Sequence, residues 1–101
     1  MATSFLKSEL TDELVRALLS LESADECYAV LEDLCTVREV RDLSQRLAVA
    51  RLLRAGTTYT EIVEKTGAST ATIGRVNRAL NYGAGGYASI LDKLYDKERK
   101  E

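Results

Sequence analysis

Residues 59–78 constrain the fold of this chain more than any other part, because their apolar positions are spaced for two short helices joined by a tight turn. The positions expected to face inward are Ile62, Val63, Ile73 and Val76. Gly67 stands between the two pairs, where the turn needs a residue that tolerates a positive φ. This spacing predicts a helix-turn-helix at about residues 58–81.

The outward positions of the second predicted helix are small, hydroxylated or cationic, and no Asp or Glu occurs between Lys65 and Asn81. Small side chains let a helix approach base edges closely, and arginine binds phosphate or reads guanine. The pattern therefore favours DNA binding. Two short helices around a glycine also occur in all-α domains that never contact DNA, so the structural alternative stays open.

Ten residues are expected to contact DNA. They are Thr58, Tyr59, Thr60, Lys65, Ser69, Thr70, Ala71, Thr72, Arg75 and Arg78. The two arginines would contact phosphate or guanine, and residues 69–72 would lie nearest the base edges or the flanking backbone. Residues 58–60 and Lys65 would touch the backbone beside the groove, and Arg54 would add to this patch.

The charge distribution agrees with a local cationic patch, although the formal net charge of the 101-residue chain is −2. Residues 1–37 hold two Lys/Arg and eight Asp/Glu, whereas residues 38–82 hold eight Lys/Arg and four Asp/Glu. Binding to phosphate follows the local field and not the total charge. The alternative is that these charges only form solvated helix faces.

The rest of the chain is expected to be helical, because it has no proline and is rich in Leu, Ala, Glu and Arg. Five to six helices are predicted, over residues 9–21, 23–34, 36–55, the two motif helices and 87–97. Their inward positions would be Leu10, Leu14, Leu18, Leu21, Cys27, Val30, Leu31, Leu34, Cys35, Val40, Leu43, Leu47, Ala50, Leu53, Ile90, Leu91 and Leu94. The length supports one domain over residues 1–101, and small helical chains often gain burial by dimerising.

Catalysis and metal binding are disfavoured by composition. The chain contains no histidine, the commonest general base and a major metal ligand. Cys27 and Cys35 fall in an apolar stripe, where cysteine is normally an inert core residue. The glycines at residues 83–86 lack the strand and the Lys-Ser/Thr of a phosphate loop. We therefore expect no catalytic residue, no metal and no enzyme activity.

No apolar run approaches the length of a transmembrane helix, and the N-terminus lacks the apolar core of a signal peptide. We therefore expect a cytoplasmic protein that has no membrane partner and whose cysteines stay reduced.

Several segments carry a resemblance to a known family. They are Glu32-Asp33-Leu34-Cys35-Thr36, Gln45-Arg46-Leu47-Ala48-Val49-Ala50-Arg51, Thr66-Gly67-Ala68-Ser69-Thr70-Ala71-Thr72-Ile73 and Leu80-Asn81-Tyr82-Gly83. The chain resembles the trp repressor superfamily, and more closely its YerC/YecD-type branch. The resemblance implies an all-α fold that forms an intertwined homodimer. It implies a bacterial transcriptional regulator, a repressor by analogy, whose two recognition helices enter successive major grooves of double-stranded DNA.

The resemblance also allows the family's tryptophan pocket to be compared position by position. Its four polar positions correspond to Thr36, Arg46, Thr72 and Arg75. Two others depart, since Val76 replaces a glycine and Ala79 replaces a serine. A branched side chain would fill the space of an indole, and a lost hydroxyl removes a hydrogen bond. L-tryptophan is therefore not expected as a corepressor and no other cofactor is indicated. Thr36 would act as a helix cap, and Arg46 in an ion pair.

Two functions remain from different classes. The first is a homodimeric, sequence-specific DNA-binding regulator. The second is a protein-interaction module, in which the helix-turn-helix is structural and the acidic first third of the chain docks a basic partner.

Overall fold

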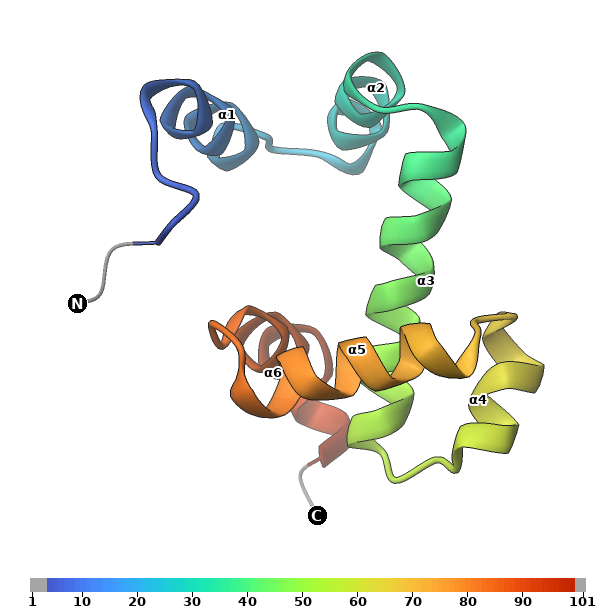
Figure 1. Ribbon diagram of the computed structural model, residues 1–101. Helices are drawn as coiled ribbons and strands as arrows, with labels where there is room; N and C mark the ends of the chain where they lie inside the picture. Colours follow the sequence, from blue (N-terminus) through green and yellow to red (C-terminus); the bar gives the residue numbers. More distant parts are fainter. Residues whose placement is uncertain (1–3, 100–101) are drawn as a thin grey trace. The chain divides into compact units, whose positions relative to one another are not determined.

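The structure is a computed structural model that describes residues 4–99, and all regular elements within that range are α-helices (Figure 1). They are α1 (Glu9–Leu19), α2 (Ala24–Leu34), α3 (Val37–Arg54), α4 (Tyr59–Thr66), α5 (Thr70–Tyr82) and α6 (Gly86–Arg99). The predicted all-α class is confirmed, and so is the order of the helices. Contacts between residues divide the chain into two compact units, one reaching Val37 and the other starting at Arg38. The expectation of a single domain stays a prediction.

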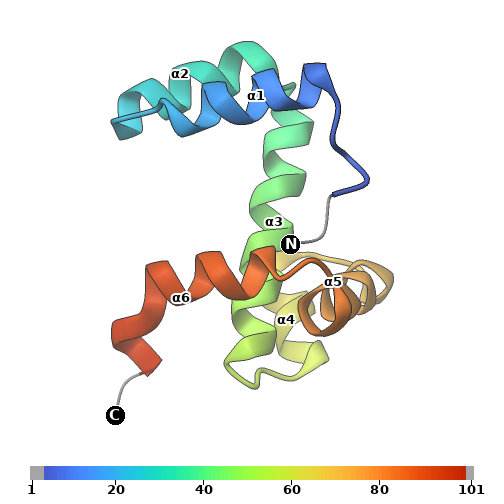
Figure 2. The ribbon, with the colours of Figure 1, turned by 90° about the vertical axis from the view of Figure 1, so that its left-hand side faces the viewer.

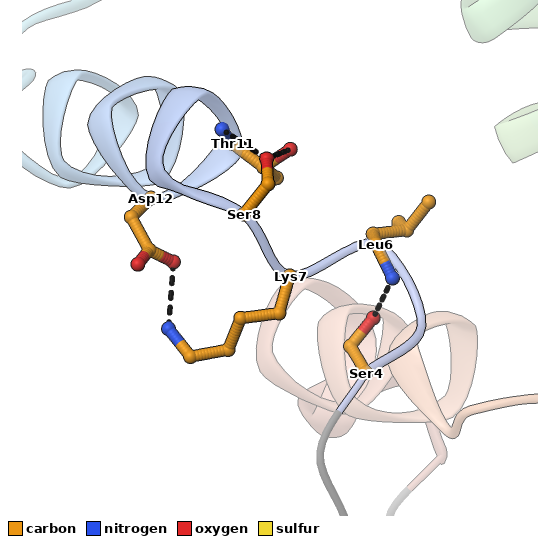
Figure 3. Close-up of polar contacts among 6 residues, drawn as sticks. All are labelled: Ser4, Leu6, Lys7, Ser8, Thr11 and Asp12. Carbon is orange, nitrogen blue, oxygen red and sulfur yellow. Dashed lines mark hydrogen bonds and ion pairs between the residues drawn. The ribbon is translucent and has the colours of Figure 1, made fainter.

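The first unit begins with a capped helix (Figure 3). The Ser8 hydroxyl accepts a hydrogen bond from the Thr11 amide at 3.1 Å, and Lys7 Nζ lies 2.7 Å from a carboxylate oxygen of Asp12. A side-chain acceptor at the N-cap satisfies an amide that has no partner within the helix. Helix α1 therefore starts where the sequence predicts, but it ends at Leu19 and not at Leu21. Helix α2 is capped in the same way by Ser23, whose hydroxyl accepts from the Glu26 amide at 3.1 Å.

Helices α1 and α2 contain no buried residue. The apolar stripe predicted to face inward on α1 is exposed, with Leu10 at 81%, Leu14 at 41% and Leu18 at 43%. On α2, Leu34 is also exposed, whereas the residues between Cys27 and Leu31 that were expected inside are half-buried. The helices follow the pattern, but their apolar faces are not covered within the single chain.

The second unit is built on α3, which ends in a hydrogen-bonded glycine turn. The Gly56 amide donates to the Leu53 carbonyl and the Thr57 amide donates to the Leu52 carbonyl, both at 3.0 Å. Gly56 has a φ of 86°, the left-handed conformation that this cap requires. The turn redirects the chain into α4.

The core of the second unit draws on all four of its helices. Its buried residues are Val49, Ala50 and Leu52 of α3, Ile62 of α4, Ala68 of the turn, Ile73 and Val76 of α5, and Leu91 of α6. Helix α5 packs against both α4 and α6 (Figures 1 and 2). The helix-turn-helix therefore packs against buried side chains of α3 and α6.

Other positions expected to face inward are exposed in this unit. Val63, Leu43, Ile90 and Leu94 are at least one-third exposed. Helix α6 packs Tyr87, Leu91 and Tyr95, which are spaced by four residues, against the core. Successive residues of a helix are rotated by about 100°, so positions 90 and 94 lie on a neighbouring face. The predicted helix is present and Leu91 is buried as predicted, but Ile90 and Leu94 are exposed. On α4, Ile62 is buried as expected, whereas Val63, which was also expected to face inward, is exposed.

Within residues 4–99, no helix combines the length and the apolar composition needed to cross a bilayer.

Gly83, which caps the C-terminus of α5, is required by the close approach of the chain to itself. A Cβ at this position would lie 2.4 Å from the Ala79 carbonyl oxygen, far inside van der Waals contact. Replacing Gly83 with alanine is therefore expected to destabilise the fold by about 1–3 kcal/mol, as overpacking does. Gly86→Ala is the matched control, because a Cβ there meets nothing within 4 Å. Thermal unfolding of both variants checks this, and equal melting temperatures would refute the clash.

Candidate nucleic-acid interface

Helix α4 and helix α5 form the helix-turn-helix that the sequence predicts. Thr58 caps α4, its hydroxyl accepting from the Glu61 amide at 3.2 Å. Gly67 ends α4 in the left-handed conformation with a φ of 75°, and its amide donates to the Val63 carbonyl. Ser69 then caps α5, its hydroxyl accepting from the Thr72 amide at 3.1 Å. Local hydrogen bonds therefore fix the turn and the start of both helices.

Helix α5 has one buried face and one open face. Ile73 and Val76 are 0% and 2% exposed and fix the inward side. The residues on the opposite side are spaced by four, three and four positions, which places them on one helix face. They are Ala71, Arg75, Arg78 and Tyr82, and all four are exposed. We call this set the outward face of α5.

Most of the other residues predicted to contact DNA are also exposed. They are Thr58, Tyr59, Thr60, Lys65, Ser69 and Thr70. Thr72 differs, because it is half-buried and its hydroxyl accepts a hydrogen bond from the Ser69 hydroxyl at 3.1 Å. This bond, with the one from the Thr72 amide, makes Thr72 part of the cap that starts α5.

Arg54 does not extend the cationic patch as the sequence suggested. Its guanidinium donates to the Ala88 carbonyl at 3.3 Å and forms an ion pair with Asp92. The Arg54 side chain is only 21% exposed. It joins α3 to α6.

The positive character of this surface follows from the absence of acidic residues in and around α5. No acidic residue lies between Glu64 and Asp92, a stretch that includes the turn and all of α5. Arg75 and Arg78 therefore project from a helix without a compensating carboxylate of its own. The first amides of α5 add a partial positive charge at its N-terminus. The arrangement suits an extended polyanion.

The positions that match a tryptophan pocket are distributed over both compact units. Val76 occupies core space at 2% exposure, and Ala79 lines an apolar pocket of about 430 Å³ with Leu47, Tyr87 and Ile90 among its walls. Arg46 is half-buried and Arg75 is exposed. Thr36 belongs to the first unit, whereas the other three polar positions belong to the second.

Tyr82 was missed in the sequence reasoning. It is 86% exposed and continues the outward face of α5 toward its C-terminal end. The signal was available, since Tyr82 follows Arg78 by four residues and Arg75 by seven.

Among the described residues, no cluster of three His, Cys, Asp or Glu side chains suits a metal ion. Both cysteines are free and half-buried.

Comparison with known proteins agrees with this architecture. The family model described as "Trp repressor protein" matches residues 9–95. "Uncharacterized protein YerC" of Bacillus subtilis (strain 168) is 50% identical over 93 residues, which are 92% of this chain and 89% of that protein. A TrpR-like protein from Eubacterium eligens ATCC 27750, known from its crystal structure, is 53% identical with a TM-score of 0.86. That match covers 88% of this chain and 92% of the other.

A second crystal structure, from Staphylococcus aureus, is 49% identical with a TM-score of 0.85 and covers 88% of this chain and 89% of that one. The matches extend over α1 to α6 and are not confined to the helix-turn-helix. The chain is thus a member of the Trp repressor family of DNA-binding regulators, in its YerC-like branch.

Proposed function

We propose that this protein is a homodimeric, sequence-specific transcriptional regulator that inserts α5 into the major groove of DNA. The outward face of α5 is the observation that carries the proposal. It presents small Ala71 near the start of the helix and Arg75 and Arg78 further along, all exposed. Recognition helices read bases from their N-terminal half and hold phosphates with cations.

Dimerisation is supported by the uncovered apolar faces of the first unit. Leu10 and Leu19 are 81% and 80% exposed, and Tyr28 is 69% exposed. Large exposed apolar side chains on two helices with no buried residue are typical of a surface that packs against another chain, which supports a dimer. A second copy of this chain supplies a matching apolar surface, and a two-fold dimer presents two copies of α5 to DNA.

The acidic residues of the first third support the alternative function, a module that docks a basic protein partner. The two functions make different predictions about nuclease. A partner held through DNA is lost when a lysate is treated with nuclease, whereas a directly docked protein is retained. Binding to DNA duplexes, measured by fluorescence anisotropy between 50 and 200 mM salt, tests the regulator directly. Affinity that falls steeply with salt supports it, and a slope near zero overturns it.

We further propose that the protein binds DNA without L-tryptophan. Saturating L-tryptophan is expected to leave both the melting temperature and the DNA affinity unchanged, because the buried Val76 side chain fills core space. A ligand present at 100 times its Kd would stabilise the native state by about 2.7 kcal/mol. Thermal unfolding with and without L-tryptophan would detect that stabilisation easily. A rise in melting temperature accompanied by tighter DNA binding would contradict this part of the proposal.

A further inference from the structure

Helix α5 contains a glycine in its interior that the fold itself does not require. Gly74 is not among the glycines with positive φ, which are Gly56, Gly67 and Gly85. A Cβ built at position 74 meets nothing within 4 Å outside its own helix backbone. Glycine weakens a helix interior relative to alanine, because it loses more backbone freedom on folding. The fold of the single chain therefore does not require a glycine at this position.

Two glycines at helix ends show, by contrast, how the fold itself can require a glycine. Gly67 needs its φ of 75° to end α4, and Gly83 has no room for a Cβ beside the Ala79 carbonyl. Gly74 has neither constraint. It follows Ala71 by three residues and precedes Arg78 by four, so it borders the outward face of α5.

We propose that Gly74 is the point of closest approach between α5 and the DNA, and that its missing side chain sets the depth of the helix in the groove. This inference rests on the proposed function. With only a backbone at position 74, base edges or groove walls can lie against the helix itself. Arg75 and Arg78 then reach their partners from a helix seated deeply. An added methyl group would hold the helix away by about one carbon–carbon bond length, and hydrogen bonds weaken steeply when their geometry is displaced.

The substitution Gly74→Ala separates this role from a structural one, because its two expected effects have opposite signs. The melting temperature should rise by about 4 °C, as a stronger helix former replaces glycine in open space. Affinity should fall at least tenfold for a duplex carrying the sequence that the wild-type protein enriches most from random DNA. Binding to a scrambled duplex of equal length should change little, since that binding depends on phosphate contacts.

Gly86→Ala is the matched control, since it makes the same chemical change at a helical glycine where a Cβ also meets nothing within 4 Å. It lies on α6 and not on α5. It should retain wild-type affinity for the enriched duplex. Wild-type affinity in Gly74→Ala, while the wild-type protein selects a sequence, would overturn the role of Gly74 alone. If the wild-type protein selects no sequence, the proposed function fails and the inference falls with it.

Discussion

Replacing Arg75 and Arg78 together with alanine is expected to abolish specific DNA binding at physiological salt. Both side chains are exposed on the outward face of α5, and no acid lies between Glu64 and Asp92 to neutralise them. A dimer would lose four cations. A hydrogen bond to a charged group contributes about 1.5–3 kcal/mol, so the loss should exceed about 100-fold. The slope of log affinity against log salt should also flatten, by about one unit for each phosphate contact removed.

The double variant Arg38→Ala and Arg41→Ala is a matched control for the loss of charge. These arginines are also three residues apart on one helix and exposed, but they lie at the start of α3. The control should bind DNA with nearly the wild-type salt slope. If the two double variants lose affinity equally, the cations act through net charge and the outward face of α5 is not the DNA-contacting surface.

Replacing Leu10 and Leu14 with aspartate is expected to produce a monomer that does not bind DNA specifically. These leucines are four residues apart on one face of α1 and are 81% and 41% exposed in the single chain. A leucine buried in an interface contributes about 1.5–3 kcal/mol, and a dimer would lose four while gaining four buried charges. Sedimentation should give the 11.1 kDa mass of one chain for the variant and twice that for the wild type.

Arg16→Asp is the control for this variant, because it also lowers the charge by two and lies on the polar side of α1. It should remain dimeric. A second observation keeps the test informative even if the leucine variant does not fold. The melting temperature of an obligate dimer rises with protein concentration, so wild-type unfolding should depend on concentration. A wild-type protein that sediments as one chain and melts independently of concentration would disprove the dimer.

The helix-turn-helix could be predicted from sequence because its determinants are local. The caps Thr58 and Ser69 lie within three residues of the amides that they bind, and Gly67 needs only its own φ. The apolar spacing of Ile73 and Val76 determines which side of α5 faces the core. Each of these signals is contained in a short window, so no knowledge of the rest of the fold was needed.

What could not be predicted depends on contacts between parts of the molecule that are distant in sequence. The stripe of Leu10, Leu14 and Leu18 gives a helix but not the surface that covers it. On α6, Leu91 is buried as expected, but the residues packed beside it are Tyr87 and Tyr95 and not Ile90 and Leu94. Arg54 is paired with Asp92, 38 residues away, so its removal from the cationic patch was not visible in the sequence.

The cations of the outward face of α5 could be predicted from the sequence, but not all of the residues on and beside that face. Arg75 and Arg78 could be predicted because cations on a helix without acidic residues favour binding to phosphate. Tyr82 and Gly74 were missed, the first because it stands beside the glycine turn and the second because glycine offers no chemistry. Only the open space around position 74 shows that its glycine is unexplained by the fold.

We propose that this chain recognises a DNA sequence as a dimer through α5. The most direct measurement is selection of sheared genomic DNA by the purified protein at near-physiological salt, beside the Arg75→Ala and Arg78→Ala double variant. We predict that the wild type enriches a two-fold symmetric sequence, with half-sites about one helical turn apart, and that the variant does not. Enrichment of no sequence by the wild type, or of the same sequence by both proteins, would contradict the account.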